Sequence, residues 1–116
     1  MEFICYSKCS TCKKAKEYLD KNNIDYIERD IKTNNPTRAE LDIIVNKYCV
    51  PINKLFNTSG LLYRSMNLKD KLKDMDDNAK LELLSSDGML VKRPLIINSD
   101  KILVGFKEKE WDEYFK

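Results

Sequence analysis

The first thirty residues alternate between short apolar runs and one charged, amphipathic segment. Residues 2–6 contain an unbroken apolar run that is typical of a short buried strand. Residues 12–22 place their apolar side chains on one helical face, and residues 24–29 begin by alternating like a second strand. Strands separated by a helix pair in parallel through a right-handed crossover, so this segment predicts a βαβ unit.

The middle of the chain is predicted to be helical but interrupted. Thr37 and Glu40 have the spacing of a capping box, which predicts that a helix begins here. Pro51 is expected to end this helix. Residues 52–84 have a helical pattern in short pieces, with a clear break at 57–60. The helix that begins at Thr37 is expected to bury Leu41, Ile44, Val45 and Tyr48.

The C-terminal part of the chain predicts a hairpin followed by a helix. Residues 95–98 and 101–105 are apolar runs joined by two residues, a connection that makes the strands antiparallel. Residues 107–115 have helical spacing and are expected to bury Trp111, with Tyr114 or Phe115 beside it. The predicted order is therefore strand–helix–strand, a helical block, and strand–strand–helix.

Composition narrows the class of protein. A chain of 116 residues is predicted to form one domain, and 21 basic against 19 acidic residues leave a net charge of +2. This balance argues against nucleic-acid binding through bulk positive charge. No apolar run is long enough for a membrane span or a signal peptide, so we expect a cytoplasmic protein. Three glycines are too few for a glycine-rich phosphate loop or a dinucleotide fingerprint.

The absence of histidine leaves cysteine as the chemically distinctive residue. Without His, the chain has no Ser-His-Asp catalysis and no His-containing zinc site. Cys9 and Cys12 form a C-x-x-C pair between the first predicted strand and the first predicted helix. Free N–H groups and the dipole at a helix N-terminus stabilise an anion, so we expect a lowered pKa for Cys9. Lys8, Lys13 and Lys14 add local positive charge. Cys12, one turn further, is placed to resolve an intermediate on Cys9.

Arg93 and Pro94 precede the third predicted strand. Together with the cysteine pair and the later hairpin, this arrangement is similar to thioredoxin-like folds. In such folds a cis proline at this point packs beside the active cysteine, so the resemblance predicts a cis Arg93–Pro94 bond. An ordinary strand-entry proline is the alternative. A guanidinium at this position is suited to stabilising a Cys9 thiolate or gripping an oxyanion.

Metal binding is the main alternative role for the cysteines. A structural zinc site needs four Cys or His ligands, and the chain has four cysteines. However, Cys5 lies in a predicted buried strand and Cys49 stands alone in the sequence. We interpret both as small core residues, with an exposed secondary thiol as the alternative for Cys49.

Several segments of the chain resemble the arsenate reductase-like (ArsC/Spx) family of the thioredoxin superfamily, and especially its uncharacterised short branch. The resemblance covers essentially the whole chain and implies a thioredoxin-like βαβ…ββα core with a mixed four-stranded sheet. An all-helical insertion is expected at about residues 37–88. The segments that carry the resemblance are Tyr6–Ala15, Asn57–Gly60 with Tyr63 and Arg64, Ser86–Leu90 with Lys92–Leu95, and Val104–Phe106.

One branch of this family contains enzymes. Its glutaredoxin-coupled arsenate reductases use one cysteine, at the position of Cys9, and three arginines that hold the oxyanion. This chain keeps Arg93, but the other two arginine positions correspond to Asn57 and Phe106. A charged hydrogen bond is worth about 1.5–3 kcal/mol, so the loss of two predicts inefficient arsenate turnover. Arg64 and Lys54 are the candidate substitutes.

The other branch contains Spx-like regulators. The resemblance implies that these use a C-x-x-C disulfide as a switch and contact the C-terminal domain of the RNA polymerase α subunit. They typically continue at the C-terminus beyond the residue that corresponds to Lys116.

We interpret the chain as a thiol–disulfide oxidoreductase of the arsenate reductase-like kind. Cys9 attacks, Cys12 resolves and Arg93 steadies negative charge, while a redox-switched regulator that binds RNA polymerase α is the alternative. The expected reductant is glutathione, thioredoxin or a glutaredoxin-type protein, with no further cofactor, no metal, no direct nucleic acid and no membrane. The other candidate substrate-binding or loop residues are Ser10, Thr11, Pro94 and Arg64.

Overall fold

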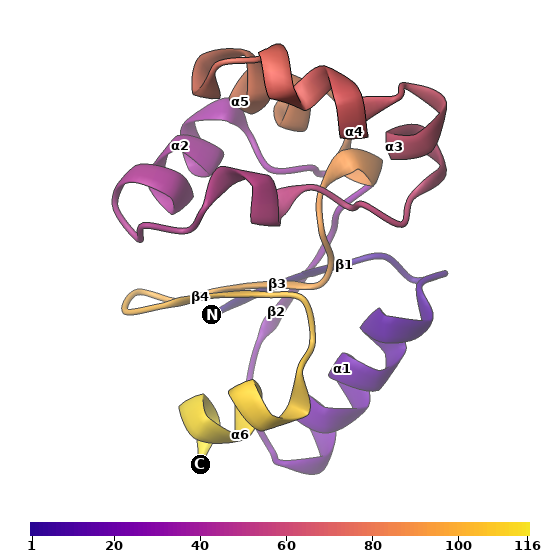
Figure 1. The fold of residues 1–116 in the computed structure, drawn as a ribbon. Coiled ribbons are helices and arrows are strands. Elements are labelled where there is room, and N and C mark those ends of the chain that lie inside the picture. Colours follow the sequence, from indigo (N-terminus) through magenta and orange to yellow (C-terminus); the bar gives the residue numbers. More distant parts are fainter. The chain divides into compact units, whose positions relative to one another are not determined.

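The computed structural model describes residues 1–116, and the chain divides into two compact units. The first unit joins Met1–Asp30 to Arg93–Lys116, and the second is Ile31–Lys92 (Figure 1). None of the helices has both the length and the apolar character needed to cross a membrane.

A four-stranded mixed sheet forms the centre of the first unit. Its strand order is β2-β1-β3-β4. β1 pairs in parallel with β2 and antiparallel with β3, and β3 pairs antiparallel with β4. This pairing confirms the predicted α/β class, the parallel βαβ unit and the hairpin. The strands are β1 (Glu2–Cys5), β2 (Ile27–Asp30), β3 (Leu95–Ile97) and β4 (Ile102–Val104).

The second strand begins later than its sequence pattern indicates. Asn23 has a left-handed backbone conformation, with φ of 55°. The N–H of Ile24 donates to the carbonyl of Leu19 at 2.9 Å. Residues 22–24 therefore close the preceding helix, and the strand starts only at Ile27.

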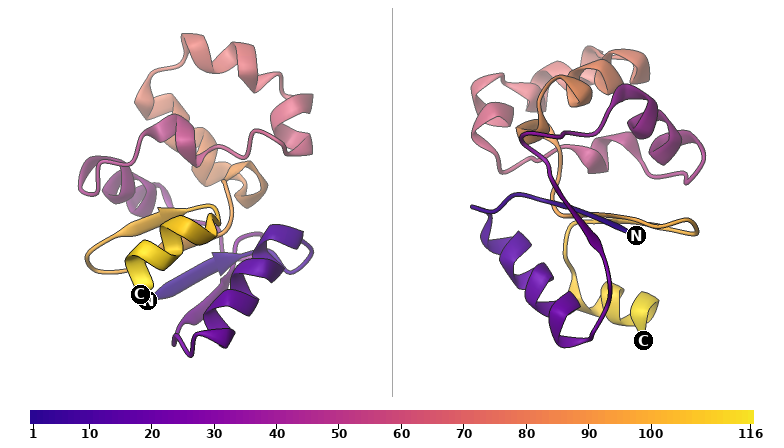
Figure 2. Two further views of the ribbon diagram at one scale, coloured as in Figure 1. Left: turned by 60° about the horizontal axis from the view of Figure 1, so that its bottom comes forward. Right: turned by 180° about the vertical axis from the view of Figure 1, so that it is seen from behind.

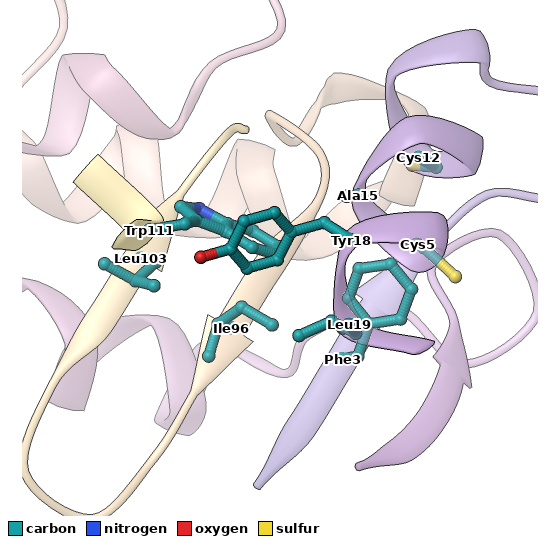
Figure 3. Close-up of a cluster of buried hydrophobic side chains, with 9 residues drawn as sticks. All are labelled: Phe3, Cys5, Cys12, Ala15, Tyr18, Leu19, Ile96, Leu103 and Trp111. Carbon is teal, nitrogen blue, oxygen red and sulfur yellow. The ribbon is translucent and has the colours of Figure 1, made fainter. Parts of the chain in front are cut away.

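Two helices, α1 (Ser10–Lys21) and α6 (Glu108–Phe115), lie on the same face of the sheet (Figures 1 and 2). Trp111 is fully buried, as predicted, and its indole N–H donates to the carbonyl of Gly105 at 3.2 Å. Tyr114 and Phe115 are only half-buried. Figure 3 shows the nine buried side chains of this core: Phe3, Cys5, Cys12, Ala15, Tyr18, Leu19, Ile96, Leu103 and Trp111.

The second unit contains only helices and short 3₁₀ turns, apart from one isolated bridge between Phe56 and Val91. This confirms the predicted run of short helical pieces. Val45 and Tyr48, predicted to be buried, are half-buried. At Gly88 an added Cβ would lie 1.8 Å from the carbonyl oxygen of Ile31, so only glycine fits. The helices are α2 (Arg38–Asn46), α3 (Leu61–Ser65), α4 (Leu68–Lys71) and α5 (Asp77–Ser86); the 3₁₀ turns are Ile52–Leu55, Leu72–Asp74 and Gly88–Leu90.

The capping box predicted at Thr37 is confirmed. The Glu40 N–H donates to Thr37 Oγ1 at 3.1 Å, and the Thr37 N–H donates to Glu40 Oε1 at 2.9 Å. We expect Thr37→Ala to lower the free energy of unfolding by about 1 kcal/mol, because it removes the side-chain acceptor at the helix start. Urea denaturation measures the change. Thr58→Ala is the matched control, because Thr58 is exposed. An equal loss in both variants would contradict the capping role.

Candidate functional site

Cys9 is the N-cap residue of α1. Its backbone is extended, with φ of −95° and ψ of 123°, and its carbonyl accepts the Lys13 N–H at 3.1 Å. The Cys9 N–H in turn donates to the carbonyl of Tyr6 at 3.0 Å, which closes the turn between β1 and α1. The helix thus begins at Ser10, two residues before the predicted start. The half-buried Cys9 side chain therefore lies beside the free N–H groups of the first turn.

The electrostatics of the first unit favour a thiolate at Cys9. Partial burial alone would raise the pKa of Cys9, but three groups together outweigh it. The backbone N–H of Cys12, the guanidinium of Arg93 and the Cys12 thiol all stabilise the anion by hydrogen bonding. The charge of Arg93 adds to this effect. The pKa of Cys9 consequently lies below its ordinary value, so more of its thiol is ionised at neutral pH.

Cys12 has the opposite character. It is buried, with 3% of its surface exposed. Burial raises the pKa of Cys12 to about 12, although the Tyr6 N–H donates to its sulfur at 3.3 Å and partly offsets the rise. All four cysteines of the structure are reduced. Of the pair, Cys9 is thus the more exposed and the more acidic thiol, while the order of attack and resolution stays a prediction.

Arg93 lies beside Cys9 and is followed by Pro94. The Arg93–Pro94 peptide bond is cis, which confirms the prediction made from the thioredoxin-like resemblance. The guanidinium of Arg93 lies over the ring of Tyr6, 5.3 Å from its centroid. Its Nε and Nη1 atoms are buried and have no hydrogen-bond partner. Arg93 therefore holds unused N–H donors next to the Cys9 sulfur, where an anionic ligand would satisfy them.

The other predicted site residues have less distinctive surroundings. Ser10 and Thr11 are exposed at the first two positions of α1, and Pro94 is buried at the entrance to β3. Arg64 belongs to the second unit, where it is exposed and its Nη2 donates to the carbonyl of Ser59 at 3.0 Å. The first unit thus brings together Cys9, Cys12 and Arg93, while the roles of Pro94 and Arg64 stay predictions.

Asn57 and Phe106, at the two missing arginine positions, both have structural contacts. Phe106 packs edge-on against Trp111, with ring centroids 4.7 Å apart, and also contacts the ring of Tyr18. Asn57 is buried in the second unit, and its side-chain Oδ1 accepts a hydrogen bond from the Ser59 hydroxyl at 3.3 Å. Neither side chain carries a charge. The structure therefore explains both residues by packing and hydrogen bonding.

The remaining two cysteines differ from each other. Cys5 is buried, as predicted, and burial together with the nearby Glu28 carboxylate raises the pKa of Cys5 to about 11. The core assignment of Cys49 is wrong, because Cys49 is exposed and has a left-handed backbone with φ of 59°. A single cysteine between the end of a helix and a proline gives no periodic signal from which its exposure could be inferred. No group of three or more Cys, Asp or Glu side chains is arranged to hold a metal ion.

Tyr6 is a site residue that the sequence analysis did not single out. Its backbone N–H binds the Cys12 sulfur, its carbonyl binds the Cys9 N–H, and its ring supports Arg93. The sequence feature that could have identified Tyr6 as a site residue is its position at the end of a strand, just before the C-x-x-C turn. The contact with Arg93 joins residues far apart in the chain, so no local pattern reveals it.

We expect Tyr6→Leu to raise the pKa of Cys9, because the guanidinium of Arg93 loses its aromatic support. The rate of Cys9 alkylation at pH 7 should fall about 2- to 5-fold, in line with the strength of a cation–π contact. Alkylation by iodoacetamide across pH, in a Cys49→Ser background, measures both quantities. Tyr6→Phe should restore the wild-type rate. An equal effect of Tyr6→Leu when Arg93 is already replaced by Gln would show that the ring does not act through Arg93.

Fold and site together define a thioredoxin-like α/β protein with a cysteine pair at the start of its first helix. The chain belongs to the ArsC family, whose family model matches residues 5–114. It is 44% identical to the uncharacterized protein YusI of Bacillus subtilis over 97% of this chain and 96% of that protein.

Solved structures and named regulators are also similar to this chain. The NMR structure of SACOL0876 from Staphylococcus aureus COL is 51% identical, with a TM-score of 0.88 and coverage of 97% of this chain and 95% of that one. The crystal structure of a possible arsenate reductase from Streptococcus mutans is 40% identical, with a TM-score of 0.87 and 96% of each chain covered. The regulatory protein MgsR of Bacillus subtilis is 29% identical over 95% of this chain and 86% of its own length. The global transcriptional regulator Spx 2 of Bacillus anthracis is 25% identical over 90% of this chain and 78% of its own length.

Proposed function

We propose that the chain is a thiol–disulfide oxidoreductase in which Cys9 is the nucleophile and Cys12 the resolving thiol. The observation that carries this proposal is the position of Cys9 at the N-cap of α1, beside Arg93 and Cys12, with a lowered pKa. A thiolate at neutral pH is the form that attacks disulfides and oxidants. The ArsC family membership, and similarity to a possible arsenate reductase, support the same reading.

The proposed reaction has two steps. The Cys9 thiolate attacks one sulfur of a disulfide substrate, forms a mixed disulfide and releases the other half as a thiolate. Cys12 then loses its proton and attacks the Cys9 sulfur, which releases the second half as a thiolate and closes the Cys9–Cys12 disulfide. The substrate has gained two electrons and the protein has lost two. A thioredoxin- or glutaredoxin-type protein or glutathione returns them in the cytoplasm.

Arsenate is expected to be a poor substrate. Arg93 supplies unpartnered N–H donors near Cys9, which suits an oxyanion. The two other positions at which arsenate reductases carry arginine hold Asn57 and Phe106, and neither adds positive charge. The proposal therefore favours a disulfide over arsenate as the oxidising substrate.

The test is NADPH consumption coupled through thioredoxin or glutaredoxin, with arsenate and a small disulfide offered in parallel. Wild-type protein should consume NADPH with the disulfide, and Cys9→Ser should not. Cys49→Ser, which changes an exposed thiol, is the matched control and should behave like wild type. An absence of Cys9-dependent consumption with every substrate and reductant would overturn the oxidoreductase proposal.

A second candidate function comes from the regulators among the relatives. Similarity to MgsR and Spx 2 over at least 90% of this chain favours a redox-switched regulator. In this role the Cys9–Cys12 disulfide would alter binding to the C-terminal domain of the RNA polymerase α subunit. Capture of purified α subunit by the reduced and the oxidised protein, compared side by side, tests the idea. Equal capture in both states, or none in either, would overturn it.

A further inference from the structure

A cavity of about 430 Å³ lies within the first unit and brings buried thiols and carboxylates to one space. Cys5 and Cys12 line it, together with Glu28 and Asp30. Figure 3 shows Cys5 at the margin of the buried cluster. A cavity of this volume with polar groups in its wall has room for several water molecules. Cys12 is only 3% exposed, so the cavity suits it to proton transfer to water and not to attack by a second molecule.

The second step of the proposed reaction requires Cys12 to lose its proton. Burial raises the pKa of Cys12, and the Cys9 thiolate raises it further by its charge and by hydrogen bonding. The contribution of Cys9 ends when the mixed disulfide forms, because its sulfur then carries no charge. Burial remains. Closure of the disulfide is therefore faster if a group inside the protein accepts the proton while the new S–S bond forms.

Glu28 has the contacts that such an acceptor needs. The Cys5 thiol donates to its Oε1 at 3.8 Å, and Lys16 Nζ forms an ion pair with the same oxygen at 2.9 Å. Because both contacts use Oε1, Oε2 is available to accept from water in the cavity. The Glu28 side chain is 47% exposed, so a proton that it accepts can pass on to solvent. Its contact with a buried thiol favours Glu28 over Asp30, the other carboxylate of the cavity.

We propose that Glu28 is the general base for closure of the Cys9–Cys12 disulfide, and that it takes the Cys12 proton through a water molecule in the cavity. The proposal rests on the proposed function, because it concerns the second step of that reaction. It deepens that function by naming the group that makes a buried thiol reactive.

The atoms and electrons of this step balance. A water molecule takes the Cys12 proton and donates one of its own to Glu28. The Cys12 sulfur bonds to the Cys9 sulfur, and the bond between Cys9 and the substrate sulfur breaks. The substrate half leaves with the electron pair as a thiolate. Glu28 then returns its proton to solvent, where the thiolate takes one up.

Dithiodipyridine separates the two steps, because its two halves are released one after the other as thiopyridone. Attack by Cys9 releases the first, and closure of the disulfide releases the second. Reduced protein in a Cys49→Ser background is mixed with one equivalent, and release is followed by stopped-flow absorbance. We expect Glu28→Gln to slow the second release relative to the first by about 100-fold, the lower end of the usual contribution of a general base. Glu17→Gln, which removes an equal charge from an exposed position outside the cavity, should leave this ratio unchanged.

Added acetate distinguishes a lost base from a disturbed structure. Glu28→Ala removes the carboxylate and leaves space for a small one, so acetate should speed its second release and leave that of wild type unchanged. An unchanged ratio in Glu28→Gln, a slowing that requires Asp30→Asn instead, or no response of Glu28→Ala to acetate would overturn the proposal, while the proposed function would stand. Wild-type protein that releases no second thiopyridone would instead overturn the proposed function, because Cys12 would then not resolve the mixed disulfide.

Discussion

Replacement of Cys9 by serine is expected to abolish turnover, whereas replacement of Cys12 should stop the reaction after its first step. A serine hydroxyl is not ionised at neutral pH, so the helix N-terminus and Arg93 then have no nucleophile to stabilise. In Cys12→Ser the Cys9 thiolate remains and still attacks a disulfide substrate. Without the buried thiol, the mixed disulfide on Cys9 should accumulate.

Intact-protein mass spectrometry after addition of a small disulfide measures this difference. Cys12→Ser should gain one adduct, located on Cys9, and wild type should instead lose two mass units as its internal disulfide closes. Cys9→Ser should gain no adduct at either position of the pair, because Cys12 is buried and its pKa is about 12. All three measurements use a Cys49→Ser background, which removes the exposed thiol. An adduct on Cys12 in Cys9→Ser would contradict the assigned roles.

The parts of the fold that were predictable from sequence are those encoded locally. The capping box at Thr37, the hairpin formed by β3 and β4, and the burial of Trp111 each follow from a few adjacent residues. The predicted ends of helices and strands were less accurate, because each end depends on which partner binds the terminal backbone N–H and C=O groups. Ile24 illustrates this, since its N–H bonds to the end of α1 and does not join the sheet.

The candidate site likewise has features that could be predicted from the sequence and features that could not. The acidity of Cys9 could be inferred, because the C-x-x-C pair lies between a predicted strand and a predicted helix. That Cys9 is itself the N-cap residue became clear only from the structure, in which the helix begins at Ser10. The contact of Tyr6 with Arg93 and the ion pair of Lys16 with Glu28 could not, because each joins residues from different elements. Only the folded sheet brings them together. Neither contact therefore had a signature in the sequence.

Phe106 shows how packing and chemistry are linked at this site. It contacts Tyr18 and Trp111, so this position belongs to the aromatic core of the first unit. An arginine there would place a charge against buried aromatic rings and leave Trp111 without one of its neighbours. The aromatic side chain thus favours core stability over a second cation in the first unit. Arg93 is consequently the residue on which charge stabilisation at Cys9 depends most directly.

Replacement of Arg93 by glutamine is expected to raise the pKa of Cys9 and to slow its reactions at neutral pH. The guanidinium lowers this pKa both by hydrogen bonding and by its charge, and glutamine lacks the charge. A charged hydrogen bond is worth about 1.5–3 kcal/mol, so the rate of Cys9 alkylation at pH 7 should fall about 10- to 100-fold. The lowered pKa keeps Cys9 ionised at pH 7. Loss of the Arg93 guanidinium raises this pKa and therefore moves the profile of alkylation rate against pH to higher pH.

Alkylation by iodoacetamide across pH, again in a Cys49→Ser background, measures the shift. At high pH, where Cys9 is ionised in every variant, the rates of Arg93→Gln and wild type should converge. Arg93→Lys separates the two contributions, because it keeps the charge but loses the planar set of N–H donors. Its profile should lie between those of wild type and Arg93→Gln. A rate that stays lower at every pH would instead mean that Arg93 shapes access to Cys9 and does not stabilise its thiolate.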